Sequence, residues 1–378
     1  MNRELEISLL QELKGLKENG LLFLDDGVQF SPVARYLSAE RFERESDRIF
    51  RSLPLIAAHA SELPEKGCFL TRQLGGLPVL LTRDRSGTVH AFVNVCRHRG
   101  ARLVGDEKGC RHSFSCPYHA WTWNSSGELR GVPHEKPGFP DLDRDAFALK
   151  RLPATERFGL VWMVTDPDAR PDFDAFLDPI AEDLVWVGMD RLRIAASDTF
   201  TLSANWKLLV EGGLEAYHFK VAHKETIGPH FVDNLSSYEM LGSHIRSILP
   251  RTSIAAMPAV GEEGWSIRDH ANVLYSVFPS SQFLLMQDHV AWVKLHPLSA
   301  GRTEVQVTTL APASAITDRQ TDHWHRNHKI TSLTLAEDFA LNEAVQSGLE
   351  SGANTALTFG RYEGALHRFN EEIEKYLV

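Results

Sequence analysis

The sequence lacks several features that mark large classes of protein. No apolar run approaches about 18 residues, the length that a membrane-spanning helix needs. The net charge is −10 and no stretch gathers five or six basic residues, so the surface would repel nucleic acid. Internal repeats and low-complexity segments are also missing. We therefore expect a globular chain of two or three domains, with neither a membrane nor a nucleic acid as its partner.

Cysteine is scarce as well, with 4 residues in 378. The first 20 residues contain no signal-peptide core, and they predict instead an amphipathic helix that ends near Gly20. These observations predict a cytoplasmic protein. In that compartment the four cysteines would be metal ligands or buried thiols rather than disulfides.

The pattern of apolar residues changes along the chain. Residues 1–55 have helical periodicity, whereas 56–165 consist of short apolar runs broken by Gly, Pro and Asn, which is typical of a small β domain. A connector rich in Pro and Asp (165–179) opens the third segment, 166–378. There a helix over 206–217 precedes several strand-like runs and two closing helices. This order predicts an α+β domain with an antiparallel sheet.

Histidine is abundant, with 17 residues, and its spacing indicates metal binding. Cys96-Arg-His98 is followed further along by Cys116-Pro-Tyr-His119. Two such loops can place two thiolates and two imidazoles around one centre. That donor set suits a Rieske [2Fe–2S] cluster, with two Cys on one iron and two His on the other, or a structural zinc ion.

The residues around these donors favour the cluster. The segments NVCRHRG and CPYHAW resemble the Rieske signature of the ring-hydroxylating oxygenase family. The resemblance implies that Cys96, His98, Cys116 and His119 hold a [2Fe–2S] cluster.

A competing Cys-x-His pair, Cys110 and His112, lies between the two loops. It lacks the Arg-Gly that follows His98, and we interpret Cys110 and Cys68 as non-ligands.

A segment beyond the β domain, NWKLLVEGGLEAYHFKVAH (205–223), resembles the same family's iron-binding segment. The resemblance implies that His218 and His223 are two ligands of a 2-His-1-carboxylate Fe(II) site. Side chains five residues apart on a regular helix point about 140° from each other. We therefore expect the helix to end or bulge near His218.

The third ligand follows from the resemblance of AEDFALNEAVQSGL to the family's late helix. It implies Asp338 as the carboxylate ligand, with Glu337 as the alternative. A rival group of histidines lies upstream and has no carboxylate motif, so we interpret it as a polar helix face. Its members are His323, His325 and His328.

Two residues depart from the family pattern. The acidic residue before the first ligand is most often Asp, whereas here it is Glu215, as in the carnitine and other quaternary-amine monooxygenases, and Gly212 replaces a common Asn. On a helix, Glu215 would lie near His218 and orient it by accepting its second N–H. The family's catalytic bridge would then run from His119 of one subunit to Glu215 of the next.

The resemblance also implies an architecture and an assembly. We expect N-terminal helices (1–55) packed on the catalytic domain, an all-β Rieske domain (56–165), and a helix-grip, START-like catalytic domain with an antiparallel sheet (166–378). Electrons would pass from NAD(P)H through a separate reductase or ferredoxin. The oxygenase would be a homotrimer, with or without a β subunit.

The implied function is that of a terminal oxygenase, which uses O₂ to mono- or dioxygenate a small aromatic or alicyclic compound. The alternative is oxidative demethylation or monooxygenation of a quaternary amine or methyl ether. Two further classes are a Rieske electron-transfer protein without enzymatic activity and a zinc-stabilised ligand-binding module. Six apolar residues of 225–300 are candidates for the substrate pocket, and we expect at least half of them to be core. They are Phe231, Met257, Trp265, Phe283, Leu285 and Trp292.

Overall fold

The computed structural model describes residues 1–257, 261–317 and 320–378. The chain divides into two compact units, one of residues 46–173 and the other of residues 1–45 together with 174–378. All paired strands in both units are antiparallel, so the expected α+β class is confirmed. None of the described helices has the length and apolar character needed to cross a bilayer.

The smaller unit is built from three small sheets, with strand orders β10-β5-β4-β3-β6, β11-β12-β2 and β7-β8-β9. Its core is aromatic, and Trp121, Trp123, Phe92 and Phe114 are all fully buried. The unit also contains one short α-helix, α4 (Glu135–Gly138), a π-helical turn over Ser46–Phe50 and a 3-10 turn over Ala60–Glu62. Its strands are β2 (Leu55–His59), β3 (Cys68–Leu74), β4 (Leu77–Arg83), β5 (Val89–Val93), β6 (Lys108–Cys110), β7 (Ser113–Ser115), β8 (Thr122–Asn124), β9 (Leu129–Gly131), β10 (Arg151–Leu152), β11 (Ala154–Arg157) and β12 (Leu160–Met163).

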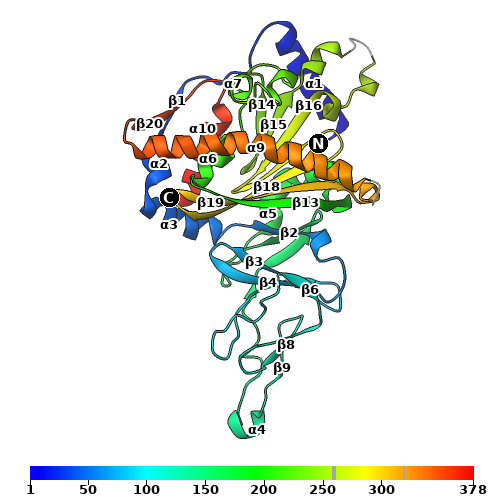
Figure 1. The fold of residues 1–378 in the computed structure, drawn as a ribbon, viewed down its shortest axis with the longest axis vertical. Helices are drawn as coiled ribbons and strands as arrows, with labels where there is room; N and C mark the ends of the chain where they lie inside the picture. The colour runs from blue at the N-terminus through cyan, green and yellow to red at the C-terminus, as the bar shows by residue number, and fades with distance from the viewer. Residues whose placement is uncertain (258–260, 318–319) are drawn as a thin grey trace. The chain divides into compact units, whose positions relative to one another are not determined.

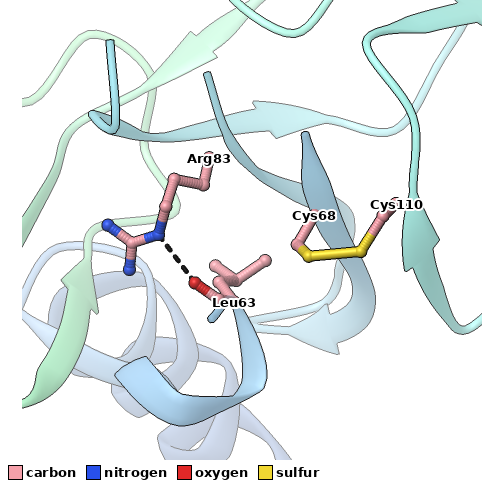
Figure 2. The surroundings of a disulfide bond; sticks show 4 residues. All are labelled: Leu63, Cys68, Arg83 and Cys110. Carbon is pink, nitrogen blue, oxygen red and sulfur yellow. Dashed lines mark hydrogen bonds between the residues drawn. A yellow bond between two sulfur atoms is a disulfide. The ribbon is translucent and has the colours of Figure 1, made fainter. Parts of the chain in front are cut away.

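Cys68 and Cys110 form a disulfide in this unit (Figure 2). They are direct partners in the register of β3 and β6, and their Cα atoms are 3.9 Å apart. Nearby, the Arg83 side chain donates to the Leu63 carbonyl at 2.6 Å. The expectation that all four cysteines are ligands or buried thiols is therefore wrong for this pair. The two cysteines are separated by 42 residues, and only the pairing of β3 with β6 brings them together.

The larger unit is organised around a seven-stranded sheet with the order β13-β19-β18-β17-β16-β15-β14. The 30-residue helix α9 lies across this sheet and contacts β13 and β19 (Figure 1). The strands are β13 (Leu192–Leu202), β14 (Ser237–Leu241), β15 (His244–Pro250), β16 (Ala271–Val277), β17 (Ser281–Leu285), β18 (Val290–Ser299) and β19 (Arg302–Pro312), with β1 (Gln29–Pro32) and β20 (Ala356–Phe359) forming a separate ribbon. The helices are α1 (Arg3–Glu18), α2 (Ala34–Leu37), α3 (Ala39–Glu45), α5 (Phe173–Val187), α6 (Trp206–Glu211), α7 (Phe219–Ala222), α8 (Ile267–His270), α9 (Thr321–Glu350) and α10 (Gly364–Leu377).

Helix α6 is fixed in the interior by polar contacts, although every one of its residues is buried. Asn205 caps its first turn by accepting from the Lys207 backbone N–H at 2.9 Å. The Lys207 ammonium group donates to both Glu45 carboxylate oxygens at 2.8 Å, and the Trp206 indole N–H donates to Glu45 at 2.9 Å. A buried charge of this kind requires such pairing. The contacts therefore tie the N-terminal helices to the segment that leads into the predicted iron ligands.

Candidate metal centres

The four predicted cluster donors lie on two loops with the same backbone design. The Gly100 N–H donates to the Cys96 carbonyl at 3.0 Å, and the Ala120 N–H donates to the Cys116 carbonyl at 2.9 Å. Gly100 and Ala120 both have left-handed backbones, with φ of 75° and 58°. Glycine adopts this conformation freely, whereas alanine does so at a cost. Each loop therefore makes one tight turn directly after its cysteine.

The side chains of these loops suit a metal cluster. Cys96 and Cys116 are buried and are not part of a disulfide. The rings of His98 and His119 are 4.8 Å apart between centroids, and the His98 Nδ1 atom is buried with no hydrogen-bond partner among the described residues. Burial raises the pKa of the Cys96 thiol. An unpartnered ring nitrogen beside two buried thiols fits a Cys₂His₂ metal centre better than an ordinary polar core.

The two predicted histidine ligands of the iron site lie at opposite ends of α7. The expected helix over 206–217 ends early, at Glu211, and a separate one-turn helix then begins after His218 and ends before His223. The segment from His218 to His223 therefore does not form part of one regular helix that begins at Trp206. Because His218 and His223 flank a short helix, both imidazoles can face one point.

Asp338 on α9 completes this group. His218, His223 and Asp338 each offer one ligand atom, and these atoms lie within 4.8 Å of one another. The Asp338 Oδ1 atom is 2.9 Å from the His223 Nε2 atom and 3.3 Å from the His218 Nε2 atom. The latter nitrogen is buried and lacks a hydrogen bond of good geometry in the described chain. Two imidazole nitrogens and one carboxylate oxygen in this arrangement fit a facial Fe(II) site.

The pKa values of His218 and Asp338 are shifted because these charged side chains lie close together. Burial works to lower the pKa of His218, but the Asp338 and Glu215 carboxylates outweigh it and raise that pKa to about 10. Burial likewise opposes ionisation of Asp338, yet contacts with both histidines lower its pKa. Positive charge is therefore strongly favoured at this point of the chain.

Glu337, the alternative ligand, has a different place from Asp338. Its Oε2 atom lies 2.6 Å from the His223 Nδ1 atom and accepts from the Thr226 hydroxyl at 2.7 Å. Nδ1 is the ring nitrogen that faces away from Asp338. Glu337 is thus placed to orient His223, a contact that the sequence analysis did not foresee.

Glu215 lies in the loop between α6 and α7 rather than on the expected helix. One carboxylate oxygen contacts the His218 Nδ1 atom, as expected for a residue that orients this ring. The other oxygen accepts the backbone N–H groups of Tyr217 and His218. Both carboxylate oxygens of Glu215 are therefore engaged within the chain, although a carboxylate oxygen can accept more than one hydrogen bond and so could still meet His119.

A cavity of about 530 Å³ opens next to the three candidate ligands, which form part of its lining. Of the six residues expected to line the pocket, Phe231 does so, and the other five are buried in the core. For Phe283, Leu285 and Trp292 the reason is the two-residue period of the strands on which they lie. On β17 the side chains of Gln282 and Leu284 face the cavity, so those of Phe283 and Leu285 point to the other side of the sheet. The expectation that at least half of the six are core is confirmed.

The rival histidine group does not form a metal site. His323 is half exposed and bonds to Asp288, whereas His328 is buried between the Thr309 hydroxyl and Asp198. The interpretation as a polar helix face is therefore wrong for His328, which faces the sheet under α9.

Two family models match the chain. The model for the Rieske [2Fe-2S] domain matches residues 54–153, and that for the ring hydroxylating alpha subunit (catalytic domain) matches residues 189–378. The second range contains both histidines, Asp338 and the cavity.

Relatives and solved structures agree with these matches. The glycine betaine monooxygenase oxygenase subunit of Pseudomonas aeruginosa (strain UCBPP-PA14) is 37% identical over 198 residues, which are 52% of this chain and 45% of the relative. The match thus spans about half of that relative's length. The carnitine monooxygenase oxygenase subunit of Acinetobacter pittii (strain PHEA-2) is 27% identical, with 85% of each chain covered. The quaternary ammonium Rieske monooxygenase CntA in complex with L-carnitine has the same fold, with a TM-score of 0.79, 24% identity, and 93% of this chain and 97% of that chain covered. The chain therefore belongs to the ring-hydroxylating alpha subunit family.

Proposed function

We propose that this chain is the terminal oxygenase of a multicomponent Rieske system, which mono- or dioxygenates a small aromatic or alicyclic compound with O₂ and electrons from a reductase. The observation that carries the proposal is the convergence of His218, His223 and Asp338 at the wall of a cavity. A second donor set, around Cys96 and Cys116, belongs to the other unit of the same chain. A Rieske protein that only carries electrons would not need the group of His218, His223 and Asp338.

Each residue has a role in this proposal. Cys96, His98, Cys116 and His119 would hold the cluster. His218, His223 and Asp338 would hold the iron at the wall of the cavity. When bound, the cluster would supply single electrons and the iron would activate O₂.

The chain's own residues prepare the iron site. Glu337 fixes the tautomer of His223, since a carboxylate at Nδ1 keeps the proton there and leaves Nε2 free to ligate. Glu215 does the same for His218. The apolar cavity wall limits the access of water to the reacting centre.

The same proposal includes partners and an assembly. Electrons would come from NAD(P)H through a separate reductase or ferredoxin. A cyclic homotrimer, with or without a β subunit, would bring His119 of one subunit to Glu215 of the next. The contact of Glu215 with His218 supports this route on the acceptor side.

A second candidate function is oxidation of a quaternary amine. It is favoured by Glu215 and by the two relatives described above, which are monooxygenases of glycine betaine and carnitine. A cation–π site for a trimethylammonium group uses aromatic faces. The aromatic residues that line the cavity within the described chain are Phe219, Phe231 and histidines.

Metal analysis followed by a turnover screen tests the proposal. We expect a brown protein with roughly three iron atoms and two acid-labile sulfides per chain. With a surrogate reductase and NADH, it should consume O₂ in the presence of an aromatic acid, an alicyclic acid or a betaine, and release an oxygenated product. A colourless zinc protein, or an iron protein with no turnover on any class, would contradict the proposal.

A further inference from the structure

The substrate cavity runs along the strands of the large sheet. Gln282 and Leu284 of β17 face it, and their neighbours across β18 are Val293 and Ala291. Just beyond the end of β17 the cavity is lined by Met286, whose sulfur accepts from the Asn272 side chain at 3.3 Å. Met286 is four residues after Gln282, which is about 13 Å in an extended chain. The cavity therefore has a Gln282 end and a Met286 end.

The Gln282 end of the cavity lies beside the loop that follows α6. A Cβ atom at Gly213, just after α6, would lie 2.9 Å from the Gln282 side chain, and one at Gly212 would lie 3.3 Å from Asn342 on α9. Asn342 is one helical turn beyond Asp338. Ile330, which also lines the cavity, is eight residues before Asp338, or about 12 Å along α9. The segment that leads into the iron ligands thus lies beside Gln282, and Met286 lies further along the sheet from it.

A cationic side chain lies at the Met286 end. Arg251 follows β15 and lines the cavity on the same strand face as Leu249. Its Nε and Nη2 atoms donate to the Asn272 side-chain oxygen at 3.1 and 2.5 Å. These two contacts aim the guanidinium group and leave its Nη1 side without a bond of its own in the described chain.

No described carboxylate forms an ion pair with Arg251. Burial lowers the pKa of Arg251. The Asp269 carboxylate, which also lines the cavity, works to raise that pKa, but this residue is exposed and accepts from Gln287 at 3.2 Å. A half-buried guanidinium group held by a neutral amide has lost part of its hydration without gaining a close ion pair, so an incoming anion would be favoured there.

The rest of the wall constrains the other part of a ligand. Between the two ends it is formed mainly by aliphatic side chains. These include Leu249, Leu274, Leu284, Val293, Ile330 and Leu335. Such a surface suits an uncharged hydrocarbon body better than a second charge.

We propose that the substrate is a carboxylic acid with an apolar body, whose carboxylate binds Arg251 while its far end reaches the iron site. The inference rests on the proposed oxygenase function and names its substrate class. Arg251 would then decide which end of the substrate is oxidised, because it fixes the carboxylate at the Met286 end of the cavity.

Binding measurements on the iron-loaded protein without O₂ test the inference. The probes are three acids and their neutral amides, namely benzoate and benzamide, 3-phenylpropionate and 3-phenylpropionamide, and cyclohexanecarboxylate and its amide, with glycine betaine as a zwitterionic acid. By calorimetric titration we expect at least one acid to bind about 10–100-fold more tightly than its amide. Glycine betaine should bind more weakly than that acid.

Two variants separate recognition from folding. Arg251→Gln should remove the preference for the acid. Asn272→Asp keeps the side-chain shape and the acceptor oxygen but places a carboxylate against Arg251, so it should remove the preference while Arg251 stays in place. Arg302→Gln removes the same charge from an exposed position outside the cavity lining, and it should change nothing.

Equal binding of acids and amides to the wild type, or no binding of either, would overturn the inference. So would an acid preference that survives in both cavity variants, or tighter binding of glycine betaine than of every other acid. O₂ consumption with neutral compounds alone would leave the oxygenase function standing and reject Arg251 as the anchor. Acid preference without turnover on any compound would reject the oxygenase function instead.

Discussion

His223 is the most constrained side chain of the candidate iron site. It is 1% exposed, and its two ring nitrogens meet different carboxylates of α9, Glu337 at Nδ1 and Asp338 at Nε2. The ring therefore has little freedom to rotate even without a metal ion.

Glu337→Gln tests the orienting role of this contact. The amide can present an N–H to Nδ1, which would favour the tautomer with its proton on Nε2, the atom that must ligate iron. We expect iron affinity to fall about 10–100-fold while the cluster stays intact. Competition with a chelator would measure the loss. Glu225→Gln, a change at an exposed residue two positions after His223, is the control and should bind iron like the wild type.

Glu215 offers a second test at the residue scale. Its two oxygens accept from the His218 ring on one side and from two backbone N–H groups on the other. In Glu215→Gln the amide NH₂ must face one of these donors, so we expect weaker iron binding and far slower electron transfer from a pre-reduced cluster at the sites that still hold iron. Rapid mixing with iron-normalised protein measures the rate. A wild-type rate would remove Glu215 from the electron path.

Single residues show what the sequence can and cannot predict. His218, His223 and Asp338 could be singled out as candidate ligands because each lies within a short segment that resembles a family motif. The residue that orients the His223 ring could not be predicted in this way. Glu337 meets His223 only because the fold brings α9 against the residue that ends α7, 114 residues away in sequence, and no local pattern records that contact.

Among the elements, α6 is notable for a buried carboxyl group at its end. Its last residue, Glu211, is buried and accepts from the Tyr36 hydroxyl at 2.7 Å and the Asn370 side chain at 2.8 Å. Burial raises the pKa of Glu211 to about 7 despite these donors. The folded chain therefore keeps a proton on Glu211 at pH values where the unfolded chain, with a pKa of 4.5, has lost it.

This shift predicts a pH dependence of stability. A raised carboxyl pKa contributes stability that is fully present below pH 4.5 and is lost as the pH rises through about 7. Glu211→Gln cannot ionise, so it should be less sensitive to pH over this window. We expect the thermal midpoint of the variant, relative to the wild type, to rise between pH 5 and pH 8. A parallel pH profile for the two proteins would contradict a protonated Glu211.

The strands were predicted unevenly, for physical reasons. β15 to β19 have apolar runs that the sequence reveals. β13 has polar residues at half-exposed and exposed positions, and it belongs to the sheet only through its pairing with β19. Helix α5 was hidden by its flanking prolines and aspartates, which suggested a connector, and Pro179 lies within it. The cavity face of β17 was predicted wrongly, because size and apolar character favoured Phe283 and Leu285, whereas the strand turns Gln282 and Leu284 toward the cavity.

At the scale of the whole molecule, the two candidate metal centres belong to separate compact units. Cys96→Ala should therefore remove the sulfide and the brown colour but leave about one iron atom per chain. His223→Ala should leave about two iron atoms and the Rieske spectrum. Iron and sulfide analysis with electron paramagnetic resonance would measure both. Loss of all metal in either variant would show that the two centres assemble together.

The neighbouring acids of α9 have a consequence for how this family can vary. Adjacent side chains on a helix point about 100° apart, and here they hold opposite nitrogens of one ring, so their order matters as much as their presence. Exchanging the two, as Glu337→Asp with Asp338→Glu, preserves charge, composition and helix propensity. It nevertheless shortens the arm on one side of His223 by a methylene and lengthens the other. The function of the pair thus depends on which acid comes first. A homologue with Asp before Glu would have to reposition either α7 or α9 to keep both contacts with the ring.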